Sequence, residues 1–144
     1  HGESYTNPDI FPDSYEAGTL NMPAIWSLKT SLEYIRTHIE EINKKESSLL
    51  ERLLAQMKAL DKVVLYNEDY SRVPTICFNI KGMASNDVVS YLDKNEICVR
   101  GGIHCAILAH ETLGTAETGA VRVSLNVFNT EKEVDTFIKV IGAL

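Results

Sequence analysis

Residues 98–124 hold most of the side chains that could take part in chemistry. This segment contains two cysteines, two histidines and two arginines around the pair Gly101–Gly102, followed by a stretch rich in Gly, Thr and Glu. Loops of this kind, carried on a rigid scaffold, are where catalytic and binding residues are usually found. We therefore expect the functional site of the chain to lie in this segment.

Cys105 is the strongest candidate nucleophile of the chain. It follows His104 directly and lies five residues after Arg100. A nearby arginine or protonated histidine stabilises a thiolate, and a short helix beginning at residue 106 would add the positive end of its dipole. A small cysteine that only packs is the alternative, and the pattern alone leaves both open. Cys77 and Cys98, each within an apolar strand, are predicted to be core residues.

Arg122 is predicted to lie in the middle of a strand, on the face opposite to the neighbouring valines. An arginine there is costly without a partner, and its planar guanidinium suits a bidentate bond to a carboxylate. It is therefore a candidate clamp for a substrate carboxylate. The alternatives are an ion pair with Glu111 or Glu117, or simple exposure. Arg100, at a strand end, allows the same interpretations.

Zinc is a weaker hypothesis for the same segment. Its ligands would be Cys98, His104, Cys105 and His110. Adjacent His and Cys side chains cannot easily point at one tetrahedral ion, so we expect no metal site.

A turn at residues 16–19 could cradle a phosphate. Gly18 permits a close backbone approach, and Thr19 supplies a hydroxyl donor. A plain turn before a helix is the better default for so short a pattern.

The elements that position these residues predict an α+β fold, a small, largely antiparallel sheet with helices packed on one face. Apolar residues at three- and four-residue spacing predict helices, and short β-branched runs predict strands. A capping box from Thr130 to Glu133 opens the last helix. The expected elements are helical patterns near 22–35 and 39–60, strands at 63–66 and 73–80, a helix at 85–95 with Ser85 as its cap, strands at 97–100 and 120–125, and a helix from 131.

The 144 residues predict one domain, residues 22–144, preceded by an irregular arm, residues 1–21. The net charge of −6 argues against a nucleic-acid surface, and no apolar run is long enough to cross a membrane. Three cysteines, an odd number, suggest free thiols in a reducing cytosol. The absence of a starting methionine suggests a cut or tagged piece.

Four segments, in this order along the chain, resemble the C-terminal part of class V aminotransferase-fold enzymes, which depend on pyridoxal phosphate (PLP). They are YEAGTLN at 15–21, VRGGIHCA at 99–106, GAVRVS at 119–124 and FNTEKEVD at 128–135. Within that class, the cysteine segment is similar to Suf-type cysteine desulfurases and their selenocysteine lyase relatives. It departs from the Suf-type pattern at Ile103, where a second histidine is usual, and at Ile107 and Leu108, near a usual proline.

The resemblance implies roles for the candidate residues. Cys105 would take the sulfur of L-cysteine as a persulfide, and Arg122 would hold the substrate carboxylate. Arg100 and His104 would flank the substrate. L-alanine would be the product, and the sulfur would pass to an acceptor protein, as in iron–sulfur cluster assembly in the cytoplasm.

The resemblance also implies that the chain is incomplete as an enzyme. Gly18 and Thr19 would reach the PLP phosphate of the partner subunit in a homodimer. The lysine that carries PLP in the family follows a histidine in a large N-terminal domain, and none of the nine lysines here follows a histidine. We therefore expect a C-terminal small domain that is inactive alone, with its arm packed on the missing large domain.

Two alternatives to a desulfurase remain open at this point. One is another class V activity, such as a selenocysteine lyase or an aminotransferase, in which Cys105 is incidental. The other is a stand-alone, non-catalytic module that binds a protein partner through its arm or a groove.

Overall fold

A computed structural model describes residues 6, 9–16, 18–66 and 73–144 of the chain. The chain forms two compact units, residues 1–39 and residues 40–144, and the long helix α1 (Met22–Lys58) contributes to both. Within the predicted arm, residues 1–5, 7–8 and 17 lie outside the described residues.

The first unit contains a one-turn 3-10 helix, η1 (Asp13–Tyr15), and the first part of α1. Asn21 caps α1, because its Oδ1 accepts a hydrogen bond from the Ala24 N–H at 3.1 Å. The two predicted helical patterns belong to one helix, which continues through residues 37–38. Its apolar side chains in this unit are exposed, among them Ile25, Trp26, Leu28, Leu32 and Ile35.

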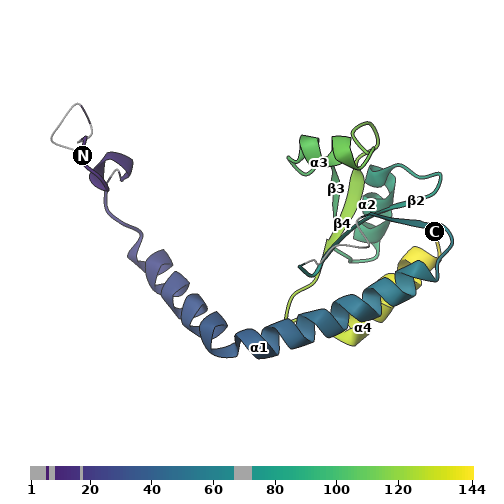
Figure 1. The fold of residues 1–144 in the computed structure, drawn as a ribbon, viewed down its shortest axis with the longest axis horizontal. Helices are drawn as coiled ribbons and strands as arrows, with labels where there is room; N and C mark the ends of the chain where they lie inside the picture. Colours follow the sequence, from purple (N-terminus) through teal and green to yellow (C-terminus); the bar gives the residue numbers. More distant parts are fainter. Residues whose placement is uncertain (1–5, 7–8, 17, 67–72) are drawn as a thin grey trace. The chain divides into compact units, whose positions relative to one another are not determined.

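The second unit is built on an antiparallel sheet (Figure 1). In the described residues its strand order is β1-β2-β4-β3, and each neighbouring pair is antiparallel. The strands are β1 (Val63–Tyr66), β2 (Thr75–Ile80), β3 (Arg100–Gly102) and β4 (Ala120–Ser124). This arrangement confirms the predicted α+β fold class.

Helices cover one face of this sheet. They are the last part of α1, α2 (Ser85–Lys94) and α4 (Glu131–Gly142). Apolar side chains of these helices and of alternate strand positions form the core, in which Phe78, Met57 and Leu92 are fully buried. Alternation along the strands is the cause, since successive side chains point to opposite faces.

The end of α4 nearest the sheet is fixed by polar contacts. The Thr130 hydroxyl accepts from the Glu133 N–H while the Glu133 carboxylate accepts from the Thr130 N–H, which confirms the predicted capping box. Arg52 of α1 makes two hydrogen bonds to Asp135, at 2.9 and 2.8 Å. Among the described residues, no helix is long and apolar enough to cross a membrane.

Several predicted boundaries differ from those of the structure. Strand β3 begins at Arg100 and not at residue 97, because Ile97 and Cys98 line a pocket against the end of β4 and do not pair with it. Ser85 is the first residue of α2 and not its cap; its hydroxyl donates to the Thr118 carbonyl instead. A short helix, α3 (Ile107–Thr112), follows Cys105 one residue later than expected.

Candidate functional site

A row of polar side chains crosses the sheet face that the helices leave uncovered. The strand registers place Tyr66 opposite Cys77, Cys77 opposite Arg122, and Arg122 opposite Arg100. Directly opposed residues of antiparallel strands share a face, so all four strands contribute to this row. We call it the polar row. It confirms that Arg122 lies on the face opposite to Val121 and Val123.

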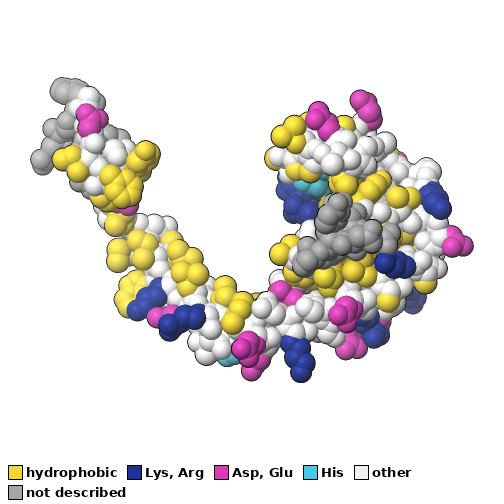
Figure 2. All heavy atoms as spheres, in the orientation of Figure 1, with side chains coloured by type: hydrophobic (Ala, Val, Ile, Leu, Met, Phe, Trp, Pro, Cys, Tyr) yellow, Lys and Arg dark blue, Asp and Glu magenta, His cyan; other side chains and the backbone are white. Residues whose placement is uncertain are grey.

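Arg100 and Arg122 lie side by side without an acidic partner. Like charges directly opposite one another destabilise a sheet. Arg100 is exposed, but Arg122 is half-buried, and a half-buried arginine usually has an anion to pair with. In the described part of the chain, neither guanidinium forms an ion pair; the alternatives Glu111 and Glu117 are not partners of Arg122. Figure 2 shows basic and histidine side chains adjoining one another beneath α3. The pair is therefore suited to an external anion.

The loop after β3 carries Cys105 in an unusual backbone conformation. His104 and Cys105 have φ angles of 55° and 58°, a left-handed region that costs a non-glycine residue roughly 1–2 kcal/mol. Backbone strain of this kind occurs mainly at functional sites. The Cys105 side chain is exposed, as a nucleophile that meets a substrate must be.

The His104 ring is held against the first residue of β3. Its Nε2 lies 3.1 Å from the Arg100 carbonyl oxygen, and since a carbonyl only accepts, Nε2 carries the hydrogen. Nδ1 of the neutral ring is then free to accept a proton. Burial lowers the pKa of His104, and the positive charges of Arg122, His110 and Arg100 lower it further, against the raising effect of the carbonyl. His104 is therefore a neutral base next to Cys105.

Cys77 is not the core residue that its apolar strand predicts. It alternates with the buried residues Ile76 and Phe78 and so faces the polar row, half-buried and opposite Arg122. Burial raises the pKa of the Cys77 thiol, and the nearby Arg122 charge opposes that effect. Cys77 is thus a protonated thiol in the polar row.

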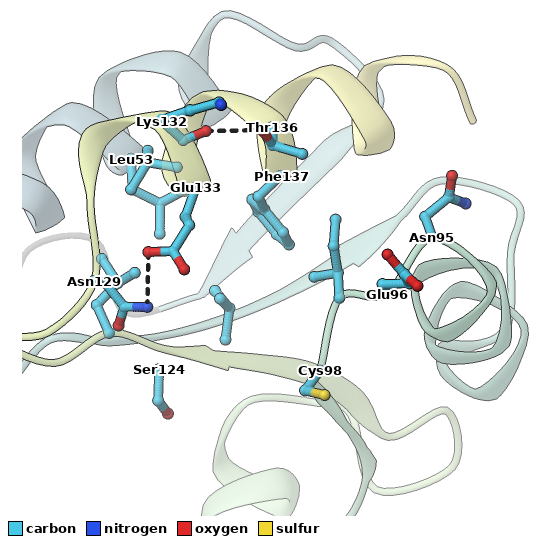
Figure 3. Close-up of a pocket in the computed structure, with 14 residues that line it drawn as sticks. Leu53, Asn95, Glu96, Cys98, Ser124, Asn129, Lys132, Glu133, Thr136 and Phe137 are labelled. Atoms are coloured by element: carbon cyan, nitrogen blue, oxygen red, sulfur yellow. Dashed lines mark hydrogen bonds between the residues drawn. The ribbon is translucent and has the colours of Figure 1, made fainter.

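Cys98 is also exposed and not in the core. It lines a pocket of about 600 Å³ between the end of β4, the segment before β3 and α4. Figure 3 shows Phe137 and Cys98 on opposite sides of this pocket. Its lining includes none of the residues Arg100, His104, Cys105 and Arg122. The pocket is therefore distinct from the candidate site.

The sequence-predicted residues divide between the two units. Arg100, His104, Cys105 and Arg122 come together in the second unit, whereas Gly18 and Thr19 lie in the first and are exposed. Gly18 has a φ of +86°, with open space where a Cβ would stand. Over the described residues, no group of three or more His, Cys, Asp or Glu side chains is placed to hold a metal ion.

Two polar residues near the site were not predicted as such: Asn79 was missed, and His110 was considered only for another role. Asn79 donates from Nδ2 to the Gly119 carbonyl at 2.9 Å and to the Tyr66 hydroxyl at 3.2 Å. The alternation of β2 could have placed Asn79 and Cys77 beside Arg122. His110, considered only as a zinc ligand, is buried and hydrogen-bonded to Thr115. Its spacing from Cys105 gave no signal of that role.

Cysteine desulfurases are among the known proteins with similar sequences and structures. A probable cysteine desulfurase of Methanothermobacter thermautotrophicus is 38% identical over 127 residues, covering 86% of this chain and 32% of that protein. One from Pyrococcus abyssi is 34% identical over 137 residues, covering 92% and 33%. The apo structure of the cysteine desulfurase of Thermococcus onnurineus matches with a TM-score of 0.82 and 30% identity, covering 96% of this chain and 37% of that one.

The chain therefore spans about a third of the length of these relatives. The family model described as aminotransferase class-V matches residues 3–137, nearly the whole chain. The match includes the β3 end, the Cys105 loop and the Arg122 strand. On this evidence, the chain belongs to the class-V aminotransferase family.

Proposed function

We propose that this chain is the C-terminal domain of a PLP-dependent cysteine desulfurase, which converts L-cysteine to L-alanine and leaves the sulfur as a persulfide on Cys105. The names of the relatives support this activity. The observation that carries it is the pair Arg100 and Arg122, which is suited to an anion and whose charges act on His104, the residue before the exposed Cys105.

Arg122 binds the substrate carboxylate in this proposal. Its place in mid-strand restrains the guanidinium, and a bidentate bond to a carboxylate fixes both position and orientation. Arg100, opposite it, adds positive charge at the mouth of the Cys105 loop. The two arginines thereby select an α-amino acid by its carboxylate.

Cys105 takes the sulfur. His104, which precedes it, is neutral, and its free Nδ1 can accept the thiol proton as the sulfur attacks. The thiolate attacks the substrate sulfur, so that an S–S bond forms and the substrate C–S bond breaks. The electron pair of the broken bond remains with the carbon skeleton, which leaves as alanine after protonation. The outer sulfur of the persulfide then passes to an acceptor protein. Such a transfer would supply sulfur to iron–sulfur cluster assembly.

We expect that the described residues of this chain do not form a PLP site by themselves. None of its nine lysines follows a histidine, and the described Gly18 and Thr19 form only an open, exposed turn. PLP, held by the rest of a longer enzyme, would supply the electron sink. Gly18 and Thr19 would contact its phosphate across a homodimer.

The arm, residues 1–21, and the first part of α1 would pack on that missing large domain. Phe11 and Tyr15 are 79% and 84% exposed, and Trp26 is 59% exposed. Apolar side chains exposed in series along one segment indicate a covered surface in the assembled protein. Residues 22–144 then form the small domain. The unpaired state of all three cysteines fits a cytosolic enzyme.

Alanine formation from L-cysteine by the longer protein tests this function. We expect the wild type to form alanine and Cys105→Ala to form none, while Cys98→Ala, a matched loss of an exposed thiol, keeps the rate. An aminotransferase would keep its rate without Cys105. A selenocysteine lyase would act on selenocysteine and leave L-cysteine unchanged. A protein without PLP would support a non-catalytic module instead.

A further inference from the structure

A buried pair behind the Cys105 loop has no part in the mechanism above. His110 and Thr115 are only 3% and 2% exposed. The His110 Nδ1 lies 2.8 Å from the Thr115 hydroxyl, and the Thr115 N–H donates to the His110 carbonyl at 2.8 Å. A buried polar pair joined by a side-chain and a backbone hydrogen bond has a fixed geometry, because leaving either partner unpaired would be costly.

The His110 ring lies against His104. The ring centroids are 5.4 Å apart and tilted by 58°. The other anchor of the His104 ring is the Arg100 carbonyl, at 3.1 Å from Nε2. The ring is therefore held between the first residue of β3 and the buried pair, which fixes the residue that precedes the nucleophile.

The loop needs such support. His104 and Cys105 are successive non-glycine residues in the left-handed region, a conformation the chain would leave if nothing held it. Downstream, the loop is tied to α3 by the Ala106 N–H to Ile103 carbonyl bond and the His110 N–H to Ala106 carbonyl bond. His110 thus contacts both sides of Cys105, through its ring and through its backbone.

We propose that His110 and Thr115 are positioning residues: their hydrogen bond orients the His110 ring, which holds His104 and keeps Cys105 in its strained, exposed conformation. Neither residue touches the substrate. The link to turnover rests on the proposed desulfurase function, but the support of the loop does not.

Hydrogen exchange on the 144-residue chain tests the support itself. Thr115→Val has nearly the same shape and removes the hydroxyl, and it should speed exchange across residues 103–110 about tenfold, the equivalent of one buried hydrogen bond. Thr115→Ser keeps the hydroxyl and should restore slow exchange. Thr112→Val is the matched control, because Thr112 donates only to the Leu108 carbonyl on the exposed side of the same helix.

Kinetics of the longer protein test the consequence for the nucleophile. Thr115→Val should lower kcat for alanine formation about tenfold and leave KM for L-cysteine unchanged, since the arginine clamp is intact. His110→Phe, which keeps a ring but loses the bond, should do the same, and Thr115→Ser should recover kcat.

Unchanged loop exchange in both Thr115→Val and His110→Phe would overturn the proposal. Equal effects of Thr115→Val and Thr112→Val would also overturn it, because the loss would then be general. If the longer protein forms no alanine, the desulfurase function fails, while loop exchange still decides whether the pair supports Cys105.

Discussion

The two faces of the sheet are built from the same strands and have opposite properties. On β4, Val121 and Val123 are 0% and 7% exposed against the helices, while Arg122 between them lies in the polar row. On β2, Phe78 is fully buried and its neighbour Cys77 faces Arg122. The difference shows how a small domain places a charged group accurately: the buried face fixes the strand, and the strand fixes the arginine.

Replacing the core residue Phe78 should have the largest effect. Phe78→Ala leaves a cavity on the covered face and should lower the free energy of unfolding by about 3–5 kcal/mol. Cys77→Ala, next to it on the other face, should cost clearly less. Urea denaturation of both variants measures the difference. Equal losses would mean that the two faces do not differ as the burial indicates.

Replacing Arg122 should affect substrate binding and leave the fold intact. Arg122→Ala should raise KM for L-cysteine in the longer protein roughly 10- to 100-fold, the value of a charge-assisted hydrogen-bonded contact. Arg122→Lys should also bind poorly, because an ammonium group cannot make the bidentate contact. Steady-state kinetics with a denaturation curve for each variant measures both properties. A normal KM, or a loss of stability matching that of Phe78→Ala, would contradict the role.

A close backbone contact at the edge of the polar row gives a third test. A Cβ on Gly119 would lie 2.8 Å from the Gly102 Cα, and Gly119 has a φ of +63°. Gly119→Ala should cost about 1–3 kcal/mol, through overpacking added to backbone strain. Gly114→Ala is the control, because Gly114 has a φ of +69° with open space around it. Thermal unfolding of both should show the larger loss for Gly119→Ala.

The pH dependence of stability should show a smaller effect of His104. Burial lowers the pKa of His104 in the folded chain, so the unfolded chain binds the proton more readily. The free energy of unfolding therefore carries no penalty from His104 at pH values above its ordinary pKa of 6.5. It decreases as the pH falls from 6.5 towards the lower pKa of the folded chain. His104→Gln should remove this slope. The measurement is the difference in urea midpoint between the wild type and His104→Gln, taken at several pH values in this range. A difference that does not vary with pH would exclude the effect.

The regular parts of the molecule could be predicted from the sequence. Period-two alternation placed Arg122 opposite the valines, and the Thr130 capping box marked the start of α4. The same alternation in β2 would have placed Cys77 in the polar row, had its apolar neighbours not suggested a core position.

Other features depend on contacts between distant residues. Cys98 is exposed because a pocket separates its segment from the end of β4, which no local pattern encodes. The strained backbone at Cys105 and the His110–Thr115 pair arise where the loop meets α3, so they became visible only in three dimensions.

Mapping the persulfide on the longer protein tests the central claim most directly. The PLP-loaded protein would be given L-cysteine and digested, and the peptides carrying Cys77, Cys98 and Cys105 would be compared by mass spectrometry. We expect the mass of one added sulfur atom on Cys105 alone. Sulfur on Cys77 or Cys98, or alanine formation without a persulfide on any of the three, would contradict the assignment of Cys105 as the nucleophile.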